Sequence, residues 1–318
     1  MRNLSLDAFR GLAILTMILV DSPPDFETLV PILKHSTWEG ITIADLAFPG
    51  FVFAMGASAA FSSRRNIWRR AGILFLLGIG FNLICGQIRI FGILQRLALT
   101  YLFGILLIRW LESPRKILSA SMILLAITSL GFHLYAPQDP FNANQNLSFA
   151  IDLTLIGQNY MYLGGFDPEG IFGTIPSTAS MLLGFCAGNF IKDQNRSLIQ
   201  FGLILILLGF AWSSIDIISK PLWTSPFALL NAGFDSILLA LIKFLPDKIF
   251  ESLIAFGQNP LFFFLATNLI LILLWKIDLY VWIWQISGLS SAMFAVIWCL
   301  IWIPLAEFFY HHRIVVKV

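Results

Sequence analysis

Long apolar runs separated by short polar stretches dominate the sequence. Most runs are roughly twenty residues long, which is what an α-helix needs to cross the hydrocarbon core of a bilayer. The pattern predicts an all-α, polytopic membrane helix bundle with about ten transmembrane helices. The expected spans are residues 5–21, 41–62, 71–86, 90–110, 116–135, 171–191, 198–215, 222–243, 252–275 and 289–310.

Two parts of this pattern are irregular. The third run is short and glycine-rich, so it could be tilted, broken or paired closely with a neighbouring helix. Residues 136–170 form the one long loop, and a connection of that length in a compact protein is usually functional or disordered. Its part 150–170 mixes apolar and aromatic residues and is predicted to pack as a lid.

Lysine and arginine are divided unevenly between the two ends of the expected spans. Cytoplasmic loops carry an excess of these residues, so both termini are predicted to be cytoplasmic and the loop 136–170 non-cytoplasmic. The poorer side holds Lys34, Arg89, Lys220 and Lys276. The richer side holds Arg2, Arg64, Arg65, Arg69, Arg70, Arg109, Arg115, Lys116, Lys192, Arg196, Lys243, Lys248, Arg313 and Lys317.

The composition is typical of a membrane protein and argues against nucleic acid and metal ions as its ligands. Of the 318 residues, 58% are hydrophobic and 12% charged, with a mean hydropathy of +0.82, whereas an ordinary soluble domain has about 25% charged residues. A net charge of +2 without a basic cluster argues against nucleic acid. The three cysteines lie inside apolar runs, and the histidines and carboxylates lack ligand spacing, so no metal site is expected.

Among the four histidines, His35 carries the main candidate chemistry. An imidazole is the side chain best suited to take a proton near neutral pH. Asp21, Trp38 and Glu39 are expected to cluster with it at a water-facing mouth. A catalytic base and an ordinary interfacial histidine are equal alternatives on local chemistry. His133, near the outer end of the fifth span, is expected to be structural.

Asp45 lies inside the apolar run that follows His35. An ionisable residue there is costly and usually faces the protein interior. A helix beginning near residue 37 would place four residues on one face, with Asp45 roughly 10 Å below Trp38. This predicts a polar shaft leading inward from His35. Its residues are Trp38, Thr42, Asp45 and Pro49.

Two arginines fall inside expected spans. Arg10 is three residues from Asp7 and shares its helix face; a terminal ion pair and a cytosolic phosphate site are equal alternatives there. Arg96 follows Gln95 in the fourth span. It either pairs with a buried carboxylate, Asp45 or Asp7, or contacts an anionic ligand, and we lean toward the ligand.

Five blocks occur in one order: LSLDAFRGLAILTMILVDSPP, KHSTWEGITIADLAFPGFVFAMGAS, RIFGILQRLALTY, DPEGIFGTIPSTASMLLGFCAG and KPLWTSPFALL. Together they closely resemble the family of heparan-α-glucosaminide N-acetyltransferase and its bacterial relatives, from the N-terminus to about residue 270. The resemblance implies a single transmembrane acyltransferase domain over residues 1–318. Its activity would be transfer of an acetyl group from cytosolic acetyl-CoA to the amine of an amino sugar or cell-envelope glycan on the opposite face.

The resemblance also implies roles for individual residues. His35 matches the catalytic histidine of the family's H-x-x-W-x-G motif. Asp21 replaces a family asparagine, and Tyr160 stands where relatives often carry a histidine, so activity of this chain is left open. The acceptor is expected at Trp38, Glu39, Asp45, Asp167 and Glu169, and acetyl-CoA at Asp7, Arg10, Gln95 and Arg96.

Two alternatives to an active acetyltransferase stay open. One is a membrane transporter for N-acetylglucosamine or related amino sugars, a label that some bacterial relatives carry. The other is a degenerate member that binds its ligand without turnover.

Acetyl-CoA is expected as the co-substrate, and no metal is expected. The expected partners are an amino-sugar acceptor and membrane lipid, with a homodimer as a further option. The bacterial inner membrane is the expected location. Heparan sulfate itself is not expected as the substrate, because the lysosomal enzyme's N-terminal extension is absent.

Overall fold

The computed structural model describes residues 3–61, 66–193 and 195–316, and every regular element within this part is a helix. Four residues used to predict the orientation, Arg2, Arg64, Arg65 and Lys317, lie outside it. The α-helices are α1 (Leu4–Asp21), α2 (Ile43–Ala59), α3 (Ile67–Ile84), α4 (Ile93–Leu111), α5 (Pro114–Tyr135), α6 (Leu147–Leu155), α7 (Thr174–Asp193), α8 (Asn195–Trp212), α9 (Ser225–Leu241), α10 (Asp247–Gln258), α11 (Pro260–Lys276), α12 (Leu279–Ser287), α13 (Ser291–Ile301) and α14 (Ile303–His311).

The all-α membrane prediction is confirmed. Among the described residues, five helices are long and apolar enough to cross a membrane, or up to six if the bent pair α10–α11 counts as one span. The five are α3, α4, α5, residues 225–244 and residues 291–311. The third expected span is a single 18-residue helix, α3. The count of about ten spans and the cytoplasmic termini stay predictions.

The expected span 252–275 is present as a bent pair of helices, which is either a broken span or a re-entrant loop. Its first part belongs to α10 and its remainder to α11, and the two helices meet at an angle of 84°. Pro260 causes the break, because proline has no backbone N–H and clashes with the preceding helical turn. Asn259 stabilises the bend: its side chain donates to the Ile314 carbonyl (2.9 Å) and accepts from the Val316 N–H (2.7 Å).

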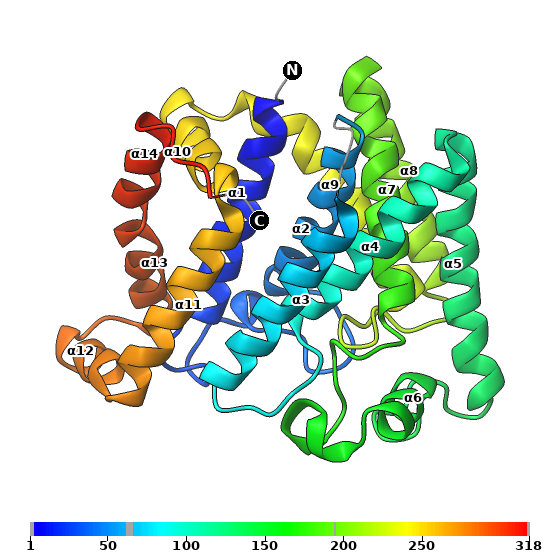
Figure 1. The fold of residues 1–318 in the computed structure, drawn as a ribbon, viewed down its shortest axis with the longest axis horizontal. Helices are drawn as coiled ribbons and strands as arrows, with labels where there is room; N and C mark the ends of the chain where they lie inside the picture. Colours follow the sequence, from blue (N-terminus) through cyan, green and yellow to red (C-terminus); the bar gives the residue numbers. More distant parts are fainter. Residues whose placement is uncertain (1–2, 62–65, 194, 317–318) are drawn as a thin grey trace. The chain divides into compact units, whose positions relative to one another are not determined.

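The chain forms two compact units. The first holds residues 3–35, 42–51 and 241–316. Within it α1 packs along α10 and also contacts α11 and α13 (Figure 1). Two glycines permit the close approach: a Cβ on Gly11 would lie 1.8 Å from the Leu253 carbonyl oxygen, and one on Gly257 would lie 1.7 Å from the Asp7 carbonyl oxygen. Small residues at such positions are typical of membrane helix pairs.

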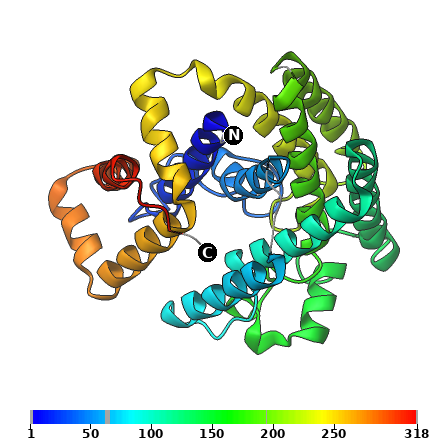
Figure 2. The same cartoon turned by 45° about the horizontal axis from the view of Figure 1, so that its top comes forward.

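The second unit holds residues 36–41 and 52–240. In it α3 packs on α4, and α7 contacts α4, α5 and α8 (Figure 2). The long loop 136–170 belongs to this unit and is ordered, with α6 followed by two short 3-10 turns. Phe141 joins a buried cluster with Phe132 and Phe172, and Phe166 packs against it. The predicted packing of residues 150–170 is therefore confirmed in part by these contacts.

Candidate active site

The chain enters α2 later than predicted. The helix begins at Ile43, not near Thr37, and Gly40 has a φ of +107°, which is incompatible with helix. The Thr42 N–H and hydroxyl both contact Asp45 Oδ2 at 3.1 Å, so Asp45 caps the first turn of α2. Trp38 is thus outside the helix, and the predicted polar shaft is wrong.

The same turn brings His35 onto Asp45. His35 Nδ1 lies 3.0 Å from Asp45 Oδ1; the imidazole is 42% exposed and the carboxylate is fully buried. Because an ionised carboxylate only accepts hydrogen bonds, Nδ1 is the donor and the neutral ring carries its lone pair on Nε2. The Thr42 hydroxyl also bonds the Lys34 carbonyl (2.7 Å), which holds the backbone next to the histidine. This geometry is that of an oriented general base.

The other residues predicted around the histidine belong to both units, and each has surroundings of its own. Trp38 is half-buried, and its indole N–H donates to the Phe141 carbonyl (2.8 Å) while its ring packs edge-on against Phe166. Glu39 is exposed. Asp21 is the last residue of α1 and is partly exposed. Of these three, Trp38 is held by packing within the second unit.

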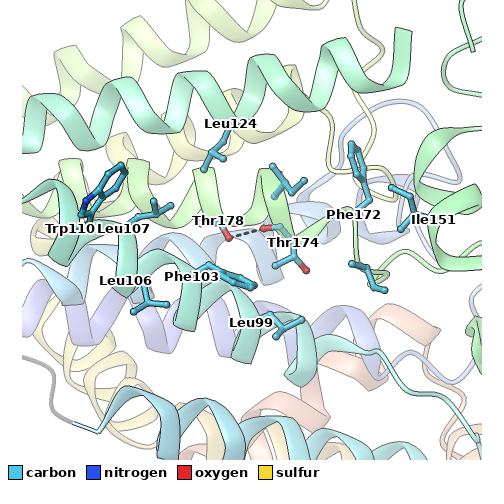
Figure 3. A pocket seen from close by; sticks show the side chains of 12 residues that line it. Leu99, Phe103, Leu106, Leu107, Trp110, Leu124, Ile151, Phe172, Thr174 and Thr178 are labelled. Atoms are coloured by element: carbon cyan, nitrogen blue, oxygen red, sulfur yellow. Dashed lines mark hydrogen bonds between the residues drawn. The ribbon is translucent and has the colours of Figure 1, made fainter. Parts of the chain in front are cut away.

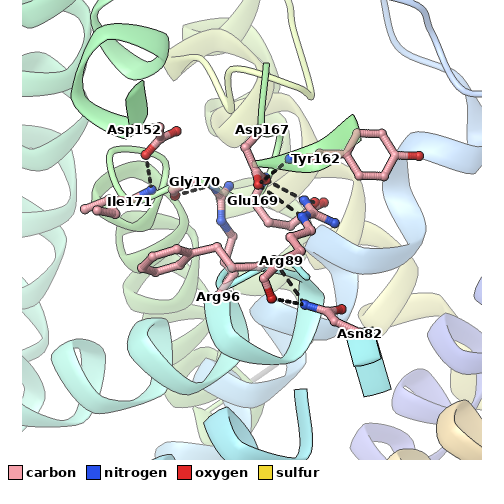
Figure 4. A network of polar contacts seen from close by, with 10 residues as sticks. Asn82, Arg89, Arg96, Asp152, Tyr162, Asp167, Glu169, Gly170 and Ile171 are labelled. Carbon is pink, nitrogen blue, oxygen red and sulfur yellow. Dashed lines mark hydrogen bonds and ion pairs between the residues drawn. The ribbon is translucent and has the colours of Figure 1, made fainter. Parts of the chain in front are cut away.

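Asp167 and Glu169 both bind Arg89 (Figure 4). Arg89 Nε donates to Asp167 Oδ2 (3.0 Å), and Nη2 forms ion pairs with both carboxylates. Asp167 is fully buried and also accepts the backbone N–H groups of Tyr162 (3.1 Å) and Glu169 (3.0 Å). Burial lowers the pKa of Arg89, but the hydrogen bond and the charges of the two carboxylates outweigh it and raise that pKa. The network ties the end of the loop to the segment before α4.

Arg96 and Gln95 are buried in α4. Arg96 Nη2 donates to the Gly170 carbonyl (2.8 Å), and its guanidinium lies over the Trp223 ring. A Cβ at Gly173 would lie 2.2 Å from Nη2, so a larger residue there would displace the guanidinium. Arg96 Nε and Nη1 and both amide atoms of Gln95 lack a hydrogen-bond partner. Such groups cost free energy unless something completes them, so this is a candidate ligand position.

Within the second unit, Arg96 donates a hydrogen bond to the Gly170 carbonyl. Asp7 instead forms an ion pair with Arg10 at the start of α1, and Asp45 binds His35. Asp7 is 1% exposed, while the Arg10 side chain is 26% exposed. The terminal ion pair is therefore present, and anion binding by Arg10 stays a prediction.

Asp152 in α6 is a buried carboxylate that the sequence reasoning missed. Its Oδ1 accepts the Ile171 N–H (2.8 Å), and its Oδ2 has no hydrogen-bond partner. Burial raises its pKa to about 7, the Ile171 hydrogen bond opposes this, and the charge of Asp167 adds to it while that of Arg96 opposes it. Near neutral pH Asp152 is thus close to half-protonated.

Stability is expected to fall as pH rises through this range. The folded-state pKa of Asp152 is raised from 3.8 to about 7, so between these values the folded protein holds a proton that the unfolded chain has lost. Each pH unit there should lower the free energy of unfolding by about 1.4 kcal/mol, with no further loss above pH 7. Thermal unfolding of detergent-solubilised Asp152→Asn should lack this component, whereas Asp139→Asn, at an exposed position, should follow the wild type. Identical pH profiles for Asp152→Asn and wild type would contradict the assignment.

Two further polar groups lie in the second unit. Asn231 and Asp235 are buried one turn apart in α9, and the amide atoms of Asn231 and Oδ2 of Asp235 lack partners. A carboxylate within an apolar run was the available signal. His133 Nε2 lies 2.9 Å from Asp216 Oδ1, which also accepts the Ser129 hydroxyl (2.9 Å). Within the described residues no three His, Cys, Asp or Glu side chains converge as metal ligands.

Comparison with known proteins identifies the family. A family profile described as "Heparan-alpha-glucosaminide N-acetyltransferase, catalytic" matches residues 2–211, which ends before the KPLWTSPFALL block and before the limit near residue 270 expected from the sequence. Heparan-alpha-glucosaminide N-acetyltransferase of Mus musculus is 28% identical over 320 residues, covering 74% of this chain and 48% of the relative. The Homo sapiens protein of the same name is 27% identical over 319 residues, covering 75% and 48%. The chain spans about half the length of these curated relatives. Since the profile covers more than half of its residues, the chain belongs to the family defined by the heparan-alpha-glucosaminide N-acetyltransferase catalytic region.

Proposed function

We propose that the chain is a transmembrane N-acetyltransferase that moves an acetyl group from cytosolic acetyl-CoA to the amine of an amino sugar or cell-envelope glycan on the opposite face. The observation that carries this proposal is the 3.0 Å contact between His35 Nδ1 and Asp45 Oδ1, in the HSTWEG stretch that resembles the family's catalytic motif. Family membership and the membrane helices support it. We further propose that the protein crosses the membrane about ten times, that both termini are cytoplasmic, and that it resides in a bacterial inner membrane.

His35 would act as the general base. Its Nε2 accepts a proton from the acceptor amine as the nitrogen attacks the thioester carbonyl; the new C–N bond forms, the C–S bond breaks, and the proton passes to the departing thiolate. Buried Asp45 stabilises the imidazolium that forms and keeps the ring oriented. An acetyl-His35 intermediate would use the same pair of side chains. Asp21, at the end of α1, is proposed as a second group that orients the imidazole.

The unpartnered donors in α4 fit a polar co-substrate. Arg96 Nε and Nη1 and the Gln95 amide are proposed to bind the pantetheine or pyrophosphate part of acetyl-CoA. Asp7 and Arg10 are proposed to contribute at the cytoplasmic edge. Trp38, Glu39 and Asp45 are proposed to line the acceptor path. Because the Asp167 carboxylate is buried and bound by Arg89, we propose that it and Glu169 shape the acceptor side through that arginine.

Acceptor-dependent release of CoA tests the proposed function. Purified protein in nanodiscs should bind acetyl-CoA with micromolar affinity by calorimetry, and amino sugar should then yield free CoA and an N-acetylated product by mass spectrometry. Uptake of N-acetylglucosamine into proteoliposomes without any need for acetyl-CoA would overturn the proposal in favour of a transporter. Binding without CoA release would indicate a degenerate member, and Asp21→Asn, which restores the family residue, would then be expected to restore turnover.

A further inference from the structure

Residues 167–171 lie at the end of the long loop, against the buried guanidinium of Arg96 (Figure 4). The Gly170 carbonyl accepts a hydrogen bond from Arg96 Nη2 (2.8 Å), and Arg96 is only 1% exposed. A Cβ on Gly170 would lie 1.7 Å from Asp152 Oδ2, so this glycine is packed closely between Arg96 and Asp152. The segment therefore covers a side chain to which the co-substrate is proposed to bind.

Two further sets of contacts hold the segment in place, and both come from the second unit. Arg89, in the connection before α4, forms ion pairs with Asp167 and Glu169. Asp152 of α6 accepts the backbone N–H of Ile171 (2.8 Å). All of these contacts involve side chains and none belongs to a helix ladder, so residues 167–171 can move away without unfolding a helix.

The polar atoms next to the segment are incompletely satisfied. Among the described residues, Arg96 Nε and Nη1, Asp152 Oδ2 and the Thr174 hydroxyl are buried and have no hydrogen-bond partner. Such atoms raise the free energy of the closed arrangement, and water would satisfy them once the segment moved. The closed arrangement therefore depends on the ion pairs of Arg89.

The segment has both room to move and a flexible end. Ile171 lines an apolar pocket of about 740 Å³ between α4, α5 and α7 (Figure 3), so it can shift without displacing a helix. On the other side, Leu163 and Gly164 have φ values of +50° and +70°. A leucine in this region is strained, and such strain is common in segments that switch conformation. Phe172 belongs to the buried aromatic cluster and marks the fixed end.

We infer that residues 167–171 form a latch that closes over Arg96 and opens and recloses during the reaction cycle. The inference rests on the proposed function and concerns the regulation of the same site. Asp167 and Glu169 belong to the proposed acceptor side, and Arg96 is a proposed co-substrate contact. A closed latch between them shields the thioester from water until the acceptor enters, which is a known role of closing loops in transferases.

Hydrogen–deuterium exchange tests the latch without requiring turnover. Glu169→Gln removes one of the two ion pairs of Arg89. The N–H groups of residues 169, 170 and 171 are all hydrogen-bonded, at 3.0, 3.1 and 2.8 Å. Their exchange in nanodiscs should become about tenfold faster in Glu169→Gln, with α4 unchanged. Tyr162→Phe keeps the aromatic ring 4.6 Å from the Arg89 guanidinium carbon and should exchange as the wild type does.

A second measurement follows acetyl-CoA in the absence of any acceptor. Water attacks the thioester carbonyl, the C–S bond breaks, and acetate and the CoA thiol are released. Glu169→Gln should raise this hydrolysis about tenfold, in proportion to the open fraction, whereas Tyr162→Phe should not.

The outcomes separate the latch from the proposed function. Unchanged exchange at residues 169–171 in Glu169→Gln, or an equal increase throughout the chain, would overturn the inference. Faster exchange without faster hydrolysis, in a protein that transfers acetyl groups, would overturn it as well. If the wild type releases no CoA even with an acceptor, the proposed function fails, and exchange then decides by itself whether the latch opens.

Discussion

Replacing His35 by glutamine should lower kcat for acetyl transfer by about 10²–10⁴-fold, the usual contribution of a positioned general base. Glutamine can occupy a similar volume and hydrogen-bond to Asp45, but it cannot take up a proton from the acceptor amine. Affinity for acetyl-CoA should change little, because the proposed CoA contacts are in α4 and α1. The measurement is CoA release under saturating substrate, with acetyl-CoA binding determined separately by calorimetry.

The chain provides a matched control for this variant. His133 also pairs with a buried aspartate, Asp216, at 2.9 Å, so His133→Gln removes a comparable pair elsewhere. It should retain the wild-type kcat. Asp45→Asn should lower kcat more than it changes the KM of the acceptor, because an amide does not stabilise the imidazolium. Wild-type turnover by His35→Gln would rule out the proposed base.

Removing the Asp167 carboxylate should destabilise the protein by about 3–5 kcal/mol. Asp167→Ala leaves Arg89, whose side chain is 9% exposed, with Glu169 as its remaining carboxylate partner. It also leaves the backbone N–H of Tyr162 without its acceptor. The loss should appear as a lower unfolding temperature in detergent. Asp139→Ala, which removes a carboxylate bonded to Asn142 at the surface, should stay within about 0.5 kcal/mol of wild type.

A triple variant keeps this prediction testable if Asp167→Ala does not fold. Replacing Arg89 and both of its carboxylate partners by uncharged residues, Arg89→Met with Asp167→Leu and Glu169→Gln, avoids an uncompensated charge and should recover part of the lost stability. Equal unfolding temperatures for Asp167→Ala and wild type would show that the ion pair contributes no net stability. A triple variant less stable than Asp167→Ala would show that the network, rather than the stranded charge, matters.

Local sequence accounts for most helices but not for how two of them begin and bend. Long apolar runs predicted α3, α4 and α5 because helix length and hydropathy are properties of contiguous residues. Pro260 alone did not predict the break between α10 and α11, because Pro49 lies inside α2 without ending that helix. The late start of α2 was missed because the Thr42–Asp45 cap was not recognised as a T-x-x-D pattern, and Asp45 was instead placed deep in the helix.

Side-chain chemistry and family resemblance pointed to the candidate residues, and both criteria use only the linear sequence. That was sufficient to select His35, Asp45, Arg96 and Asp167. It did not reveal their partners, because a hydrogen bond depends on which backbones meet in space: Asp167 binds Arg89 across 78 positions, and Arg96 reaches a carbonyl 74 positions away.

Membrane class, helical content and family membership were thus already present in the order of amino acids, because hydropathy and motif identity are local properties. The His35–Asp45 pair and the unpartnered donors of Arg96 required the folded chain. Each arises from side chains of different segments brought within contact distance, and packing rather than composition sets that distance.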